Sequence, residues 1–583
     1  MASSSITTAT SKPKLHGRAF YESLGSPKFV VAPMVDQSEF AWRKLTRSFL
    51  SPQDNAKLLA YTPMFHARLF DETPKYRDAH FQATKQPVGT PECDPASLFL
   101  DGNPSFDRPL FVQFCANDPE QLLHAAEMVA PYCDAVDLNL GCPQGIARKG
   151  RYGAFLQEDQ DLIYRLINIL HENLSIPVTA KIRILDTKED TLAYAKNVLA
   201  AGASVLTVHG RRREQKGHLT GVADWGYIRY LRENLPKETV IFANGNILQH
   251  GDIEKCLEAT GADAVMSAEG NLSDPSIFAA PPQLGQEGRE YWRGRDGRGG
   301  YRVDAVFRRY VDILHKYALD QEPPQRRPLF VVGDDESWLH DTAAQNSGDH
   351  EEGPPRKKAK HDGPSKQRST SPNIVGVRPH LFHLLRHFVS RHTDIRDTLA
   401  RTNPGDINGI ETVLDMVERR VARGLIDYER TDGKSIEEED PVLPKPKAQT
   451  TTEPPKVDNG GKEQREVDDP EYDPESSVAT VKSCKRPWWV AQPIVRPLPK
   501  EALAKGSIKM SKKDRKKQEQ EQAVAASMAV TPVTAAEDIN GHRQSQGKLE
   551  DELPATDERD GGIKEPSIDP VAPELTSDQL VSG

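Results

Sequence analysis

Cysteine is scarce in this sequence: six cysteines are scattered among 583 residues, and none belongs to a CxxC pair. Isolated cysteines in a chain of this size indicate a reducing compartment, and they argue against a disulfide framework and against a zinc cluster. We therefore expect an intracellular protein without a metal site, located in the cytoplasm, the nucleus or both.

Long apolar runs are also missing. No run approaches the ~18 residues that a membrane span requires, and the first ten residues, MASSSITTAT, lack the apolar core of a secretory signal. Only 37% of the residues are hydrophobic, so much of the chain lacks the apolar surface that a packed core needs. The sequence predicts a soluble protein with no membrane contact.

An excess of basic residues is absent as well, since the formal net charge is -10. The acidity is uneven, because residues 435–583 contribute about -8 of it. A near-neutral body can still present a basic face, and affinity for phosphates depends on local lysine and arginine density. The overall charge therefore does not exclude a nucleic-acid partner.

Eight short apolar runs are present, and most are separated by segments long enough for one helix. The runs are residues 29–33, 58–61, 110–114, 135–138, 178–182, 204–208, 240–243 and 264–266. Strands that alternate with helices indicate a parallel sheet. Eight such units in roughly 250 residues match the usual size of a (β/α)8, or TIM, barrel. We therefore predict an α/β protein built on that barrel.

The rest of the chain divides by composition. We expect a flexible arm at residues 1–26, the barrel at 27–285, a small helical domain at 300–430 and a mostly disordered tail at 431–583. The helical domain shows apolar periodicity at residues 301–315, 379–389 and 410–421, and a polar insertion at about 320–372 interrupts it. We expect the long segment 65–107 to be a lid or binding loop. Deleting residues 435–583 should leave the fold intact.

Polar residues follow most of the predicted strands. They are Gln113, Cys142, Lys181, His209, Asn244 and Glu269, and the apolar Met34 holds the matching position after the first strand. Residues just after the strands of a TIM barrel face one shared active site. The sequence therefore predicts that these side chains meet.

The last two strands end in glycine-bearing loops, residues 243–247 (ANGNI) and 267–271 (SAEGN). Barrels often hold a phosphate in the loops after strands seven and eight, where glycine allows close backbone approach. Either loop alone is more simply an ordinary turn. Both together at the correct strand ends predict a phosphate site.

Lys181 and His209 end the next two strands back along the chain. A lysine in an apolar strand is costly to bury without a partner. A bound anionic or carbonyl-bearing ligand explains Lys181, and a salt bridge across the barrel mouth is the alternative. His209 is either a ligand contact or a satisfied core histidine. Because Arg211, Arg212 and Arg213 follow it, the mouth is strongly cationic.

Cys142 lies in a Gly-Cys-Pro turn at the end of the run DLNLGCPQ, residues 137–144. Three roles are open: a small buried hydrophobe, a nucleophile, or a proton donor. No activating base is adjacent in sequence, which disfavours the nucleophile. A thiol with a pKa near ~8.5 is protonated at neutral pH and can still release its proton. We favour the general acid.

Together these motifs resemble the tRNA-dihydrouridine synthase family. The resemblance rests on APMV at 32–35, LNLGCPQ at 138–144, KIR at 181–183, HGR at 209–211 and NGN at 244–246. YGAFL at 152–156 and AEG at 268–270 are similar to the eukaryotic branch that modifies positions 16 and 17 of the D-loop. The similarity covers about residues 25–320, and it is the order and spacing of the motifs that make it specific.

The resemblance implies an FMN-binding barrel that uses NADPH or NADH to reduce the C5–C6 double bond of uridine in tRNA. Hydride would reach C6 and Cys142 would protonate C5. Catalytic roles are implied for Cys142, Lys181, His209 and Arg211. Cofactor contacts are implied for Pro33, Met34, Val35, Gln113, Lys181, His209, Asn244, Gly245, Asn246, Ala268 and Glu269. Asn246 stands where the bacterial pattern commonly has Asp, and Ala268-Glu269 where it has Gly-Arg.

The resemblance also implies a tRNA partner for the helical domain and a base drawn out of its stack into the pocket. We expect Arg308, Arg309, Arg386 and Arg391 to contact the RNA backbone, and we expect a monomer. Two other classes remain open. A flavin barrel acting on a small molecule would not need the helical domain, and a non-catalytic RNA-binding factor would not need Cys142, Lys181 and His209.

Overall fold

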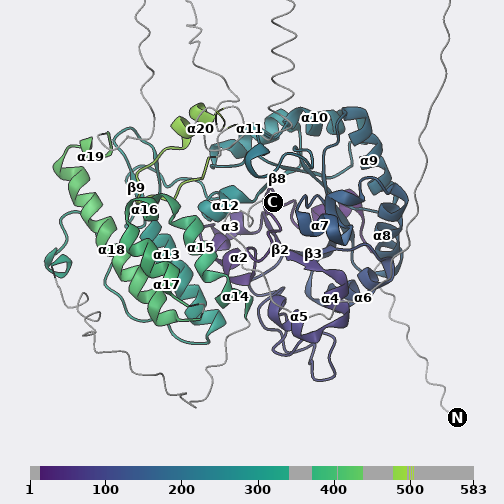
Figure 1. Ribbon diagram of the computed structural model, residues 1–583, viewed down its shortest axis with the longest axis horizontal. Helices are drawn as coiled ribbons and strands as arrows, with labels where there is room; N and C mark the ends of the chain where they lie inside the picture. Colours follow the sequence, from purple (N-terminus) through teal and green to yellow (C-terminus); the bar gives the residue numbers. More distant parts are fainter. Residues whose placement is uncertain are drawn as a thin grey trace, which may run out of the picture. The chain divides into compact units, whose positions relative to one another are not determined.

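The computed structural model describes residues 14–340, 371–403, 405–437, 477–495, 498, 501 and 503. Eight parallel strands pair in sequence order and close into a barrel (Figure 1). The strands are β1 Phe29–Val31, β2 Leu58–His66, β3 Leu110–Cys115, β4 Ala135–Leu140, β5 Val178–Arg183, β6 Leu206–His209, β7 Ile241–Asn244 and β8 Ala264–Ser267. The predicted TIM barrel is confirmed, and each strand includes residues of its predicted run.

Helices follow the strands and cover the barrel. They include α2 Phe40–Arg47, α6 Pro119–Val129, α8 Gln160–Asn173, α9 Lys188–Ala200, α10 Trp225–Asn234, α11 Gly251–Thr260 and the short α12 Glu269–Ser273. Local sequence explains their starts: the side chains of Asp118, Asp159 and Thr187 each accept a backbone N–H in the first turn of α6, α8 and α9. Each helix then buries an apolar stripe against the strands.

The described part of the predicted arm contains α1 Gly17–Ser23, which closes the amino-terminal end of the barrel. Phe20 and Tyr21 are buried, and the Phe20 ring stacks on Phe111 at the start of β3. Arg18 pairs with Asp263, directly before β8, at 2.6 Å. Residues 14–26 therefore belong to the barrel, which differs from our expectation of a flexible arm, and residues 1–13 lie outside the described part.

The segment 65–107 is folded rather than an extended loop. It contains α4 Ala67–Glu72 and α5 Pro74–His80, and Phe70, Phe81 and Leu100 are buried. Its end is fixed by Arg43 of α2, which donates to Asp107 and Asp101 in a fully buried cluster. The lid expectation therefore has no support in this arrangement.

The helical domain packs beside the barrel and begins with a hairpin, β9 Tyr291–Arg293 and β10 Gly299–Tyr301. Its helices are α13 Val303–Ile313 with a π turn at Leu314–Ala318, α14 Pro372–Val375, α15 Val377–Leu384, α16 Arg386–Arg391, α17 Thr393–Arg401, α18 Ile407–Arg430 and α19 Lys434–Glu437. No helix among the residues that the structure describes is long and apolar enough to cross a membrane.

A buried histidine joins this domain to the barrel. His380 of α15 stacks on Trp42 of α2 with the ring centroids 4.0 Å apart, and its Nε2 lies 2.9 and 3.0 Å from the carboxylate oxygens of Glu39. Glu39 precedes α2 directly and follows the loop that holds Met34. The helical domain thus contacts the segment that leaves the barrel mouth after β1.

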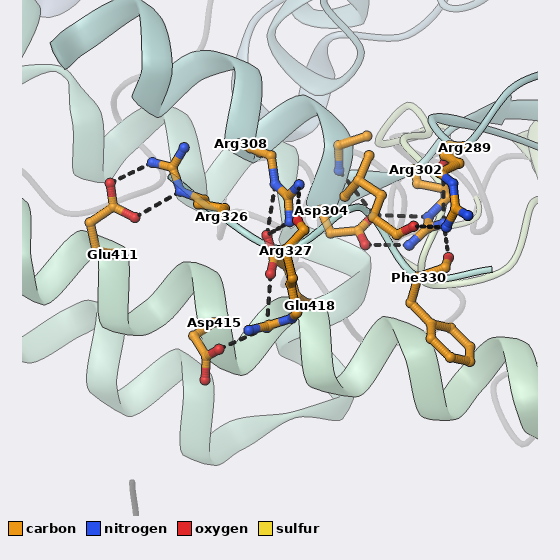
Figure 2. Close-up of polar contacts among 12 residues, drawn as sticks. Arg289, Arg302, Asp304, Arg308, Arg326, Arg327, Phe330, Glu411, Asp415 and Glu418 are labelled. Carbon is orange, nitrogen blue, oxygen red and sulfur yellow. Dashed lines mark hydrogen bonds and ion pairs between the residues drawn. The ribbon is translucent and has the colours of Figure 1, made fainter. Parts of the chain in front are cut away.

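Ion pairs fix residues 320–340 against α13 and α18 (Figure 2). Arg326 pairs with Glu411 at 2.5 Å and Arg327 with Asp415 at 2.7 Å. Phe330 and Leu339 are buried. We expected these residues to open a disordered insertion, and the structure instead places them in the helical domain. Residues 341–370, with the basic run RKKAK at 356–360, lie outside the described part.

A segment far along the chain completes the hairpin. Residues 489–491 pair antiparallel with β10 and the residues after it: Val303 N–H donates to Trp489 O at 2.9 Å, and Ala491 N–H to Tyr301 O at 2.8 Å. Trp489, Val490 and Ala491 are buried. Our expectation that residues 435–583 can be removed without affecting the fold is therefore wrong for this segment. The basic run at 511–517 lies outside the described residues.

Candidate functional site

The predicted site residues converge at the carboxyl ends of the barrel strands. Register pairs Gln113 with Asp137, Asn139 with Lys181, Arg183 with His209, and His209 with Asn244. Because inward-facing side chains on neighbouring strands lie side by side, these residues form one polar surface at the barrel mouth. Cys142 follows β4 on the same rim.

Lys181 is 6% exposed at the inner end of β5. Burial, and then the charge of Arg183, lower its pKa to about 7, although Asp137 and Cys142 favour the charged form. Lys181 makes no ion pair among the described residues, so the salt bridge across the mouth that we considered is not formed there. A lysine held so close to its titration point is suited to an anionic or electron-rich ligand.

The His209 side chain is buried, and Arg211 is its one polar partner within the described residues. Burial, and then the charges of Arg183, Lys181 and Arg211, lower its pKa well below the usual value, so the ring is neutral at pH 7. Arg211 Nη1 lies 3.0 Å from His209 Nε2, which places the ring hydrogen on Nδ1. That buried Nδ1 has no hydrogen-bond partner within the described part of the chain.

The contacts of Asn246 explain why an asparagine stands at this position, where the bacterial pattern commonly has Asp. Its backbone is left-handed, with φ 63°, and its side-chain oxygen accepts from Arg211 at 2.8 Å and from the Ala223 N–H at 3.0 Å. Its Nδ2 donates to Ala223 O at 2.9 Å. An amide can make both kinds of bond, which a carboxylate cannot. It also leaves the Arg211 charge without a carboxylate at this position.

The two predicted phosphate loops lie against each other. Ser267 donates to Ile247 O at 3.0 Å, and a Cβ at Gly270 would lie 2.2 Å from the same carbonyl. Gly245 has φ +116°, and a Cβ there would meet Ala223 at 2.6 Å. Asn244 Oδ1 is buried without a partner among the residues described. Gly270 is therefore required for the two loops to approach this closely, and Gly245 for the first loop to pack against Ala223. Ala268 is buried and Glu269 is half-buried beside them.

The loop after β1 contributes Pro33, Met34 and Val35. Met34 is 5% exposed, and its N–H donates to Ser38 Oγ at 3.0 Å. This bond holds the loop in a tight turn at the start of α2. The structure thus places Met34 and its neighbours on the rim, next to β8, whose Ser267 carbonyl accepts from Ala32.

Cys142 is 8% exposed and packs with Cys115, Ala147 and Tyr152. Burial raises the pKa of its thiol, so the sulfur stays protonated at neutral pH. Gly153 closes on it, since a Cβ at Gly153 would lie 2.8 Å from Cys142 O. Lys216 donates to Pro143 O at 2.5 Å and ties the loop after β6 to this turn. This environment suits a proton donor and not a thiolate nucleophile.

Asp137, Asn139, Thr179 and Arg183 also belong to the site, and the sequence analysis missed them. Asp137 and Thr179 lie inside apolar runs that we interpreted only as strands, and Asn139 and Arg183 directly follow those runs. Strand alternation was the available signal, because Asp137 and Asn139, like Thr179 and Lys181, are two residues apart and share one face. No group of three or more potential metal ligands occurs among the described residues.

Two of the four predicted RNA contacts are used inside the protein. Arg308 pairs with Glu418 at 2.6 Å (Figure 2), and Arg309 pairs with Glu290 and donates to Ser48 O. These bonds fix α13 within the fold. The prediction for Arg308 and Arg309 is therefore wrong, while Arg386 and Arg391 are exposed on α16.

Comparison with known proteins gives a consistent result. The family model "Dihydrouridine synthase (Dus)" matches residues 30–293. A Saccharomyces cerevisiae protein named tRNA-dihydrouridine(16/17) synthase, with NAD(P)+ in its name, is 47% identical over 67% of this chain and 73% of its own. The Schizosaccharomyces pombe protein of the same name is 42% identical over 73% and 86%. A human protein named as tRNA-dihydrouridine(20a/20b) synthase-like is 33% identical over 43% and 70%.

Proposed function

The chain belongs to the dihydrouridine synthase family, and from this membership we propose that it reduces uridine to dihydrouridine in tRNA, at positions 16 and 17. NADPH or NADH is the reductant and FMN the resident cofactor. The observation that supports this most is the convergence of Cys142, Lys181 and His209 on one barrel mouth. The position in tRNA rests on the two fungal relatives and their names.

The residues present fit a flavin. His209 Nδ1 and Asn244 Oδ1 are buried polar atoms that need one acceptor and one donor, and each costs about 1–3 kcal/mol while unsatisfied. The flavin ring edge and the ribityl hydroxyls offer both kinds of group. The loops at 244–247 and 267–270 would hold the phosphate through backbone N–H groups, with Arg211 as the nearest cation. Met34 and Val35 would border the ring, whereas Gln113 is fully buried in its hydrogen bonds to Asp137 and Asn139.

Bound FMN would supply the hydride that NADPH delivers and that C6 of the uracil receives. The protein then has three tasks. Lys181 places a positive charge where electron density accumulates. The Cys142 thiol gives its proton to C5, so that one hydride and one proton saturate the double bond, and solvent returns the proton to the sulfur. The Cys142 turn and the loop after β6, tied by Lys216, exclude water.

This function is tested on the purified protein by its visible absorbance. We expect a flavin band that bleaches on anaerobic addition of NADPH and returns when unmodified tRNA is added. Free uridine and orotate, which both carry a reducible C5–C6 double bond, are the matched controls for a small-molecule substrate, and neither should restore the band. A colourless protein, or return of the band with a small molecule and not with tRNA, would contradict the proposal.

Replacing Lys181 by methionine should separate stability from function. In the fold Lys181 is protonated only up to about pH 7, but in the unfolded chain it is protonated up to the ordinary lysine pKa of 10.5. Its burial therefore destabilises the apoprotein fully below pH 7 and not at all above pH 10.5. Lys181→Met should stabilise the apoprotein by on the order of 3–5 kcal/mol at low pH, while flavin retention and tRNA turnover fall. Urea unfolding across pH measures the first effect. Unchanged flavin content and rate would contradict the catalytic role.

A further inference from the structure

A chain of buried hydrogen bonds runs from the inside of the barrel to the Cys142 turn. Gln113 Nε2 donates to Asp137 Oδ2 at 2.8 Å, and Asn139 Nδ2 donates to Gln113 Oε1 at 2.8 Å. Asn139 Oδ1 in turn accepts the N–H groups of Gly141 at 3.1 Å and Cys142 at 2.9 Å. Asp137 and Gln113 are fully buried and Asn139 is 9% exposed.

The direction of this chain is set at one end. A carboxylate accepts and cannot donate. Asp137 therefore forces Gln113 to point its NH2 group toward Asp137 and its oxygen toward Asn139. That oxygen then requires the NH2 group of Asn139, which leaves the Asn139 oxygen for the backbone. Thr179 donates to the other Asp137 oxygen at 2.6 Å. Burial raises the pKa of Asp137 and the Thr179 and Gln113 donors oppose it, which together give about 6, so the ionised form predominates at neutral pH.

We propose that Asp137 is a positioning residue that orients the Gln113 and Asn139 amides and thereby holds the Cys142 thiol in place for the uracil. Two further contacts restrict the same turn: Arg183 Nε donates to Gly141 O at 2.7 Å, and Ala154 N–H donates to Cys142 O at 3.1 Å. Among the residues that the structure describes, Asn139 is the one that holds the Cys142 N–H itself. Displacing a reacting group by about 1 Å costs on the order of 10²-fold in rate.

Exchanging the two side chains tests the direction of the chain. In Asn139→Asp, carboxylates face both ends of Gln113, so one contact is acceptor against acceptor whichever way the amide turns. In Asp137→Asn the amide has no imposed direction, and the defect should be smaller. In the double variant Asp137→Asn with Asn139→Asp, every bond is satisfied again with Gln113 reversed, and the carboxylate that accepts the Cys142 N–H is no longer repelled by Gln113.

The experiment measures tRNA reduction with excess FMN, NADPH oxidation with a non-RNA acceptor, and the alkylation rate of Cys142 followed by peptide mass spectrometry. We expect Asn139→Asp to lower the kcat for tRNA by on the order of 10²-fold and Asp137→Asn by less, with NADPH oxidation retained and Cys142 alkylated faster. The double variant should recover at least about tenfold over Asn139→Asp. Lower pH should partly rescue Asn139→Asp, because one added proton restores a donor.

The control is Thr179→Ser, which keeps the hydroxyl donor to Asp137 and reverses neither amide, and it should leave Cys142 protected. Defects that simply multiply in the double variant, or wild-type turnover and alkylation in both single variants, would overturn the proposal. The proposal rests on the function above, and alkylation of Cys142 keeps the two separate: it reports on the turn even if the wild type fails to reduce tRNA. Should Asn139→Asp not fold, Asp137→Asn with faster alkylation supports the proposal and with unchanged alkylation overturns it.

Discussion

Cys142→Ala should lower tRNA reduction by roughly 10²–10⁴-fold, the usual contribution of a positioned general acid, while flavin content and NADPH oxidation stay close to wild type. The physical reason is that the thiol acts only on C5 of the uracil and takes no part in flavin binding or in the oxidation of NADPH. The raised pKa of the thiol and its burial keep the proton on sulfur until the uracil of the tRNA is bound. The measurement is single-turnover transfer from the NADPH-reduced protein to unmodified tRNA.

Cys115→Ala is the matched control, because this thiol is buried in the same small cluster and has no part in the proposed chemistry. We expect near wild-type transfer from it. Full activity of Cys142→Ala on tRNA would contradict the general-acid role. An equal loss in both variants would show instead that packing around the turn is what matters.

Trp489→Ala should destabilise the protein by about 3–5 kcal/mol, the range found when a large buried aromatic side chain is removed. Trp489 is 2% exposed and contacts Trp292, Tyr428 and Trp488 edge-on. A truncation after residue 434 removes this side chain and both backbone bonds to the hairpin, so it should be worse still. Urea or thermal unfolding measures both.

Lys482→Ala is the control within the same segment, since its side chain is exposed, and we expect a change within about 0.5 kcal/mol. An unchanged midpoint for the truncated protein would contradict the integration of residues 486–492 into the helical domain. Aggregated or poorly expressed truncated protein would agree with it.

The barrel could be predicted from the sequence because parallel strands buried on both faces are near-continuous apolar runs. Each of the eight runs was visible without knowing its neighbours. The arm and the tail were misjudged for the opposite reason. Phe20 and Trp489 lie in short apolar islands inside polar surroundings, and their burial depends on partners such as Phe111 and Trp292 that are many residues away.

Charged residues show the same limit. The sequence predicts RNA contacts at Arg308 and Arg309 because it displays their charge but not the partner of that charge. Glu418 and Glu290 neutralise them through contacts that only the fold creates. In the site, Lys181 and His209 were found because they interrupt apolar strands at their ends. Asp137 lies in the middle of its strand between Val136 and Leu138, so the sequence predicts only a strand there and no role in the site.

The most direct test of the central claim is a nucleotide-resolution map of dihydrouridine in unmodified tRNA after incubation with the purified protein, FMN and NADPH. The account predicts dihydrouridine at positions 16 and 17 in the wild-type reaction, and none with Cys142→Ala over the same time. Dihydrouridine at position 20a or 20b with unmodified uridine at 16 and 17 would contradict the assigned position. A map without dihydrouridine at any position, from protein that retains flavin and oxidises NADPH, would contradict the claim itself.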